Sequence, residues 1–99
     1  MAYRIRYAKP TAEHFAYLSR PQQQAVFNAV DRQLKYEPTV ETRNRKHMRP
    51  NPLASWELRI GDLRVYYDVL EEPEPTVLVV AVGVKDGSML RIGGEIITL

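Results

Sequence analysis

The sequence predicts an α+β domain in which two N-terminal helices pack on one face of a mostly antiparallel sheet of four to five strands. Three observations indicate this two-layer sandwich: an alternating hairpin over residues 56–69, two helical segments that precede it, and an uninterrupted apolar run over residues 77–84. With 99 residues and no cysteine, the chain suits one domain, residues 1–99, whose core needs no disulfide.

The hairpin is the strongest local signal. Residues 56–60 and 63–69 alternate apolar with polar side chains, and Gly61-Asp62 supplies a two-residue turn. This register places Arg59 opposite Arg64, and like charges that face each other across a ladder destabilise it by roughly 0.2–1 kcal/mol. An anion bound there would relieve the repulsion, and two solvated arginines that splay apart would relieve it equally well. By the same alternation Tyr66 shares the arginine face, whereas Trp56 and Tyr67 point toward the core.

The N-terminal third supplies the helical layer. Residues 3–7 alternate as a first strand, and Thr11 can cap a short helix over residues 12–18. Ser19 and Gln22 have the spacing of a capping box that opens a second helix, which Pro38 ends. Its apolar side chains recur every four residues and predict a face that packs on the sheet: Val26, Val30 and Leu34.

The remaining strands follow the hairpin. The run over residues 77–84 does not alternate, which is typical of a central strand covered on both faces. Residues 89–92 form a short extended piece, and residues 95–99 are an apolar tail that suits an edge strand.

Residues 38–55 form a long basic connection. Prolines at positions 38, 50 and 52 predict irregular structure, and loops of this length are usually functional or mobile. Its basic residues predict phosphate contacts or, alternatively, a solvated crossover: Arg43, Arg45, Lys46 and Arg49. His47 has no second ligand at metal-binding spacing, so no metal or other cofactor is expected.

Charge is distributed unevenly along the chain. The net charge is +2, but residues 1–35 hold six basic and two acidic residues, whereas residues 71–99 hold two basic and five acidic residues. This asymmetry favours an anionic partner, although mixed surface charge that serves only solubility has the same pattern. No signal peptide or membrane-spanning run is evident, so we expect a soluble cytoplasmic protein without a membrane partner.

The order of elements, the hairpin Trp56-Glu57-Leu58-Arg59-Ile60-Gly61-Asp62-Leu63-Arg64-Val65-Tyr66-Tyr67-Asp68-Val69 and the strand end Val80-Ala81-Val82-Gly83-Val84-Lys85 resemble the RelE/ParE superfamily of bacterial toxins from type II toxin–antitoxin pairs. The resemblance covers nearly the whole chain. It implies a cytoplasmic toxin that a cognate antitoxin neutralises. RelE-type members cut messenger RNA on the ribosome without a metal, whereas ParE-type members share the fold and act on DNA gyrase.

Carried over by position, the resemblance implies four catalytic residues: Arg59, Arg64, Lys85 and Arg91. Arginines would stabilise the charge of the phosphorane, and a lysine can transfer a proton if neighbouring cations or burial lower its pKa. Glu57 stands where several ribonuclease members have a basic residue, so it is a candidate general base or a partner that neutralises Arg59. Tyr66 is a candidate stacking platform for a base.

Three functions follow from the resemblance. The first is a ribosome-dependent mRNA endoribonuclease that inhibits translation. The second is a toxin that binds gyrase without chemistry of its own, and the third is a degenerate member that only binds its antitoxin or DNA. The C-terminal segment lacks the tyrosine or histidine that often completes the ribonuclease site, and Met89, Leu90 and Arg91 stand in that region.

Overall fold

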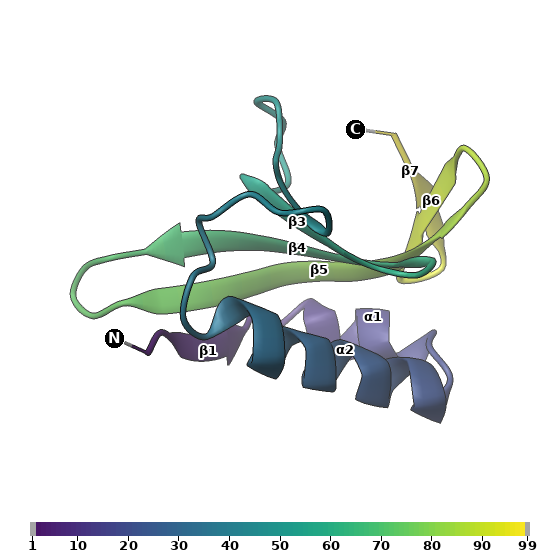
Figure 1. Ribbon diagram of the computed structural model, residues 1–99. Coiled ribbons are helices and arrows are strands. Elements are labelled where there is room, and N and C mark those ends of the chain that lie inside the picture. Colours follow the sequence, from purple (N-terminus) through teal and green to yellow (C-terminus); the bar gives the residue numbers. More distant parts are fainter. Residues whose placement is uncertain (1, 99) are drawn as a thin grey trace.

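The computed structural model describes residues 2–98 and shows two helices on one side of a seven-stranded sheet (Figure 1). Within this part of the chain, no helix is long and apolar enough to span a membrane. The elements in chain order are β1 (Arg4–Tyr7), α1 (Thr11–Ala16), α2 (Arg20–Leu34), β2 (Arg45–His47), β3 (Trp56–Ile60), β4 (Leu63–Leu70), β5 (Thr76–Asp86), β6 (Met89–Ile92) and β7 (Glu95–Ile97).

The sheet has the strand order β2-β3-β4-β5-β6-β7, and β1 pairs with β5 in parallel. The predicted α+β class is therefore confirmed, with all other pairs antiparallel. The expected number of four to five strands is too low. Both short C-terminal segments, β6 and β7, pair into the sheet. A further strand, β2, forms inside the connection over residues 38–55 because it pairs with β3, a partner that local sequence does not reveal.

The central hairpin has the register that alternation predicts. Arg59 lies opposite Arg64 and Trp56 lies opposite Tyr67, on either side of the turn at Gly61, whose φ is +57°. Strand β5 is central as expected, because β4 pairs with one of its edges while β1 and β6 pair with successive parts of the other.

The helices begin almost where the sequence indicates. Ser19 and Gln22 form the capping box of α2, with the Gln22 amide donating to Ser19 Oγ at 3.2 Å and the Ser19 amide donating to Gln22 Oε1 at 2.9 Å. Helix α1 covers Thr11–Ala16 rather than residues 12–18, and Thr11 does not cap it. The Thr11 side chain is buried instead, and its hydroxyl donates to the carbonyl of Ala8 at 2.6 Å.

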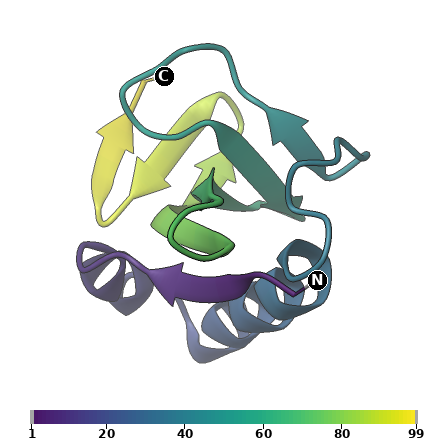
Figure 2. The same cartoon turned by 90° about the vertical axis from the view of Figure 1, so that its left-hand side faces the viewer.

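Apolar side chains cover both faces of the sheet. The main core lies between the sheet and the helices and includes Trp56 and Tyr67, as predicted. A second, smaller cluster lies on the helix-free face, where the segment after β2 and the β6–β7 hairpin curve over the sheet (Figure 2). Its buried members are Ala54, Tyr66, Ala81, Leu90 and Ile92.

Gly83 marks the place where β6 lies closest to β5. A Cβ atom at this position would lie 2.3 Å from the carbonyl oxygen of Arg91 and 2.8 Å from Ile92 Cγ1. Because real Cβ atoms do not approach so closely, only glycine allows β6 to pair here. From this point the β6–β7 hairpin rises on the side opposite the helices (Figure 1).

Candidate functional site

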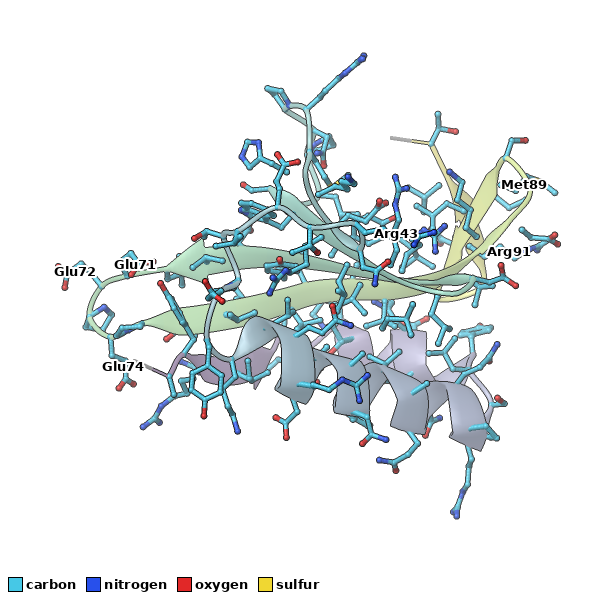
Figure 3. All side chains as sticks on the ribbon, in the orientation of Figure 1. Arg43, Glu71, Glu72, Glu74, Met89 and Arg91 are labelled. Atoms are coloured by element: carbon cyan, nitrogen blue, oxygen red, sulfur yellow. The ribbon has the colours of Figure 1, made fainter. Side chains whose placement is uncertain are left out.

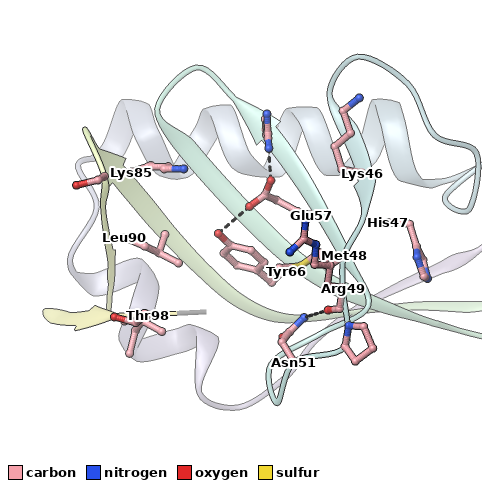
Figure 4. Close-up of a pocket in the computed structure, with 14 residues that line it drawn as sticks. Lys46, His47, Met48, Arg49, Asn51, Glu57, Tyr66, Lys85, Leu90 and Thr98 are labelled. Atoms are coloured by element: carbon pink, nitrogen blue, oxygen red, sulfur yellow. Dashed lines mark hydrogen bonds and ion pairs between the residues drawn. The ribbon is translucent and has the colours of Figure 1, made fainter.

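A hollow of about 560 Å³ lies on the helix-free face between the segment around Met48–Asn51 and the β6–β7 hairpin (Figure 4). Glu57 and Tyr66 lie between these two walls. The full lining is Lys46, His47, Met48, Arg49, Pro50, Asn51, Glu57, Arg59, Tyr66, Lys85, Ser88, Leu90, Ile97 and Thr98.

Strand register explains why these side chains meet. Residues paired directly across a ladder point to the same face of the sheet. Lys46, Glu57 and Tyr66 form one such row across β2, β3 and β4. Lys85, Leu90 and Ile97 form a second row across β5, β6 and β7. The hollow lies between the two rows because the sheet curves.

The lining is strongly cationic. Four basic side chains border the hollow, namely Lys46, Arg49, Arg59 and Lys85, and Glu57 is the one carboxylate among the residues described there. Uncompensated positive charge in a concave site attracts anions and concentrates them locally. The chemistry of the lining therefore suits a ligand that carries negative charge.

Glu57 is held in place by two donors. Arg59 Nε donates to its Oε1 at 2.7 Å, and the Tyr66 hydroxyl donates to its Oε2 at 3.0 Å (Figure 4). The Glu57 side chain is only 13% exposed. Burial, and then the nearby Glu57 carboxylate, raise the pKa of Tyr66, so the hydroxyl keeps its proton and remains a donor. Both oxygens of Glu57 are thus fixed toward the hollow with a defined orientation.

Arg64 does not join Arg59 in the hollow. Its Nη1 donates to the carbonyl oxygens of Gly61 at 2.7 Å and Leu63 at 2.9 Å, and Arg64 is absent from the lining. The like-charge pair is therefore relieved inside the chain, because Arg59 turns to Glu57 while Arg64 turns to the hairpin turn. No bound anion is therefore required to relieve the repulsion between Arg59 and Arg64.

The other residues proposed to contact RNA divide into two groups. Lys46 and Arg49 line the hollow. Arg45 instead turns its Nη1 to the carbonyl of Gln33 in α2, and Arg43 is exposed outside the hollow. Tyr66 is only 1% exposed, so its ring belongs to the second core cluster and is no platform for a base. Residues of the segment before β3 and of the β6–β7 hairpin bury it, and alternation along β4 does not reveal these distant contacts.

Arg91 lies apart from the other candidate catalytic residues. Within β6, Leu90 and Ile92 face the second core cluster, so strand alternation turns Arg91 to the helix side. There it borders a smaller hollow of about 180 Å³ beside His14, whose Nδ1 accepts from the Val82 amide at 3.3 Å. Figure 3 shows Arg91 near one end of the sheet and the acidic residues Glu71, Glu72 and Glu74 at the other.

Several lining residues did not stand out in the sequence. Met48, Leu90, Ile97 and Thr98 belong to this group, and their signal is only a weak alternation in short segments. Asn51 carried a clearer signal, because an asparagine between two prolines favours a turn that its own side chain closes. No group of three or more histidine, aspartate or glutamate residues suited to a metal ion occurs within residues 2–98.

Comparisons with known proteins agree with this architecture. No protein-family model matches the sequence, and no curated protein matches it. Among solved structures, a chain of the crystal structure of the toxin–antitoxin complex RelBE2 from Mycobacterium tuberculosis is similar, with a TM-score of 0.73 and 22% sequence identity. The match covers 86% of this chain and 100% of that chain. The protein therefore has the RelE-like α+β fold.

Proposed function

We propose that this protein is the toxin of a type II toxin–antitoxin pair, and that it cuts messenger RNA on the ribosome without a metal ion. The observation that carries the proposal is the hollow itself: four basic side chains and one clamped carboxylate border it. The RelE-like fold, shared with a chain of a toxin–antitoxin complex, supports the same function. A cognate antitoxin would neutralise it in the cytoplasm.

The reaction needs a base, positive charge and an acid. Glu57 takes the proton from the 2′-hydroxyl of the RNA, and the resulting oxygen attacks the adjacent phosphorus. Arg59 and Lys46 stabilise the negative charge that accumulates on the phosphorane oxygens. The bond from phosphorus to the 5′-oxygen breaks, and the Lys85 ammonium gives that oxygen a proton. The products are a 2′,3′-cyclic phosphate and a 5′-hydroxyl. Glu57 ends the reaction protonated and Lys85 ends it neutral, so each exchanges one proton with water before the next cleavage.

These roles agree with the placement of the side chains. Glu57 is fixed by Arg59 and Tyr66, so its position requires no rearrangement before the reaction. Lys85 stands in the neighbouring row and borders the same hollow, where it and Glu57 extend from different strands (Figure 4). Acid and base therefore approach a bound phosphate from separate strands.

Cleavage of a defined message on programmed ribosomes tests this function. Purified protein should produce one cut in the codon of the A site, and primer extension together with end labelling should reveal a 5′-hydroxyl on the downstream fragment. Intact message with undisturbed protein synthesis would remove the proposal. If the same preparation inhibited the supercoiling activity of DNA gyrase, a ParE-like toxin would then be favoured. Growth that overexpression leaves unaffected would favour a member that only binds its antitoxin.

A further inference from the structure

The two sides of the hollow differ in chemistry. One side, called here the charged half, carries ionised side chains, and the other, called here the apolar half, holds Met48, Leu90 and Ile97 together with the polar but uncharged Asn51 and Thr98. In Figure 4, Lys85, Glu57 and Lys46 lie along one side, while Leu90, Thr98 and Asn51 lie along the other. The proposed reaction uses only the charged half. The apolar half is lined from one wall by Met48 and from the other by Leu90 and Ile97, and it has no part in proton transfer.

The apolar half is continuous with the charged half. Leu90 pairs directly with Lys85 on one side and with Ile97 on the other, so the three side chains follow one another across the sheet. Leu90 is 7% exposed, whereas Met48 and Ile97 are only half-buried and pack against the second core cluster. A group that covered Met48 and Ile97 would therefore be separated from Lys85 only by the side chain of Leu90.

The wall around Met48 is built before any ligand arrives. Asn51 Nδ2 donates to the carbonyls of Arg49 at 2.7 Å and Ala54 at 2.9 Å, and its Oδ1 accepts from the amides of Leu53 at 2.8 Å and Ala54 at 3.1 Å. These four bonds use both protons and both lone pairs of the side-chain amide. Asn51 thus fixes the shape of the wall and has no group left with which to read a ligand.

We propose that the apolar half is a subsite for one nucleobase of the RNA, which lies between Met48 and the pair Leu90 and Ile97 while its phosphate meets the basic residues. The inference rests on the proposed function, because it assigns the rest of the same substrate. A ligand with a flat apolar body and an adjacent negative charge complements both halves, and 560 Å³ lies within the roughly 300–1,000 Å³ of ligand pockets. Recognition is by apolar contact, so the base preference is broad.

An abasic substitution tests the subsite because it removes a base and leaves its phosphates in place. The probe is a short fluorescent RNA whose central nucleotide carries a 2′-deoxyribose and is therefore not cut. A series of the same RNA, in which one position at a time is abasic, is compared with it. Binding is measured by anisotropy. One abasic position should weaken binding to the wild-type protein by about tenfold, as expected when an apolar contact of a kcal/mol or more is lost.

Two adjacent isoleucines supply the variant and its matched control. Ile97→Ser should lower the affinity for the intact RNA to that for the abasic RNA and leave the abasic affinity unchanged. Ile96 lies on the other face of β7, where it pairs with Arg91 and is 56% exposed, so Ile96→Ser should change neither affinity. Met48→Ser tests the opposite wall in the same way, and thermal melting confirms that each variant is folded.

Equal binding of the intact RNA and of every abasic RNA to the wild-type protein would overturn the subsite, and this result requires no variant. An Ile97→Ser protein that loses affinity equally for intact and abasic RNA would also overturn it. Cleavage on ribosomes combined with base-independent binding would remove the subsite and keep the proposed function. Base-dependent binding without any cleavage would remove the nuclease and keep the subsite.

Discussion

Two adjacent tyrosines offer a test of how Glu57 is held. Tyr66 is 1% exposed and donates its hydroxyl to the Glu57 carboxylate at 3.0 Å, whereas Tyr67 is fully buried on the other face and donates to the carbonyl of Pro38 at 2.7 Å. Replacing either with phenylalanine deletes one buried hydroxyl and one hydrogen bond. The two variants therefore differ only in the charge of the acceptor and in the face of the sheet.

The expected stability losses follow from that difference. A hydrogen bond to a charged group contributes about 1.5–3 kcal/mol and one to a neutral group about 0.5–1.5 kcal/mol. Tyr66→Phe should therefore lower the free energy of unfolding by about 1.5 kcal/mol or more. The loss should stay below the upper end of that range, because Arg59 still donates a hydrogen bond to Glu57. In a domain of this size each kcal/mol corresponds to about 4–8 °C in melting temperature.

Urea unfolding and ribosomal cleavage together measure both consequences. Tyr66→Phe should lose stability and also most of its cleavage rate, because Glu57 retains only one of its two donors. Tyr67→Phe should lose the smaller amount of stability and keep its cleavage rate at a temperature where both variants are folded. Equal cleavage by the two variants, or a greater loss in Tyr67→Phe, would show that the Tyr66 hydroxyl does not orient a reacting carboxylate.

Three further predictions address the fold around the hollow. Arg64→Ala should lower the free energy of unfolding by about 1 kcal/mol, because its hydrogen bonds to the turn are lost, and it should keep most of its cleavage activity. A variant that is fully stable in urea but inactive in cleavage would contradict this placement of Arg64. Gly83→Ala should cost at least about 1–3 kcal/mol in urea unfolding, because its Cβ would meet the neighbouring strand, and wild-type stability would refute that contact. Burial lowers the pKa of His14, so the unfolded chain binds the proton more readily and stability should fall as pH drops below about 6.5. Urea midpoints between about pH 7 and pH 5 should show this slope in His47→Gln and not in His14→Gln, and the same slope in both would exclude His14 as its source.

Local sequence was sufficient where partners are close along the chain. The hairpin register, and with it the Arg59–Arg64 pair, depends on alternation and a two-residue turn, and both are present within fourteen residues of sequence. The capping box of α2 depends on Ser19 and Gln22 alone. These features could be predicted because the interacting groups are neighbours.

The remaining features depend on distant partners. Alternation places Arg64 on the correct face, but its guanidinium direction depends on the turn carbonyls that it reaches. Tyr66 is covered by segments that follow it and precede it in the chain, and Arg91 is turned away by the pairing of β6 with β5. Side-chain direction, cover and the face on which Arg91 lies thus depend on tertiary contacts, whereas the face and register of the central hairpin follow from local pattern.

The position of the reactive site can be tested by comparing the cleavage rates of Lys85→Ala and Arg91→Ala on programmed ribosomes. Both remove one exposed cation from the C-terminal third, but Lys85 borders the basic hollow and Arg91 lies on the helix side. Loss of a proton donor predicts a rate lower by about 10²–10⁴-fold for Lys85→Ala. The rate of Arg91→Ala should be nearly unchanged, because this side chain lies outside the basic hollow. The reverse result, with Arg91→Ala inactive and Lys85→Ala active, would contradict the placement of the reactive site in this hollow.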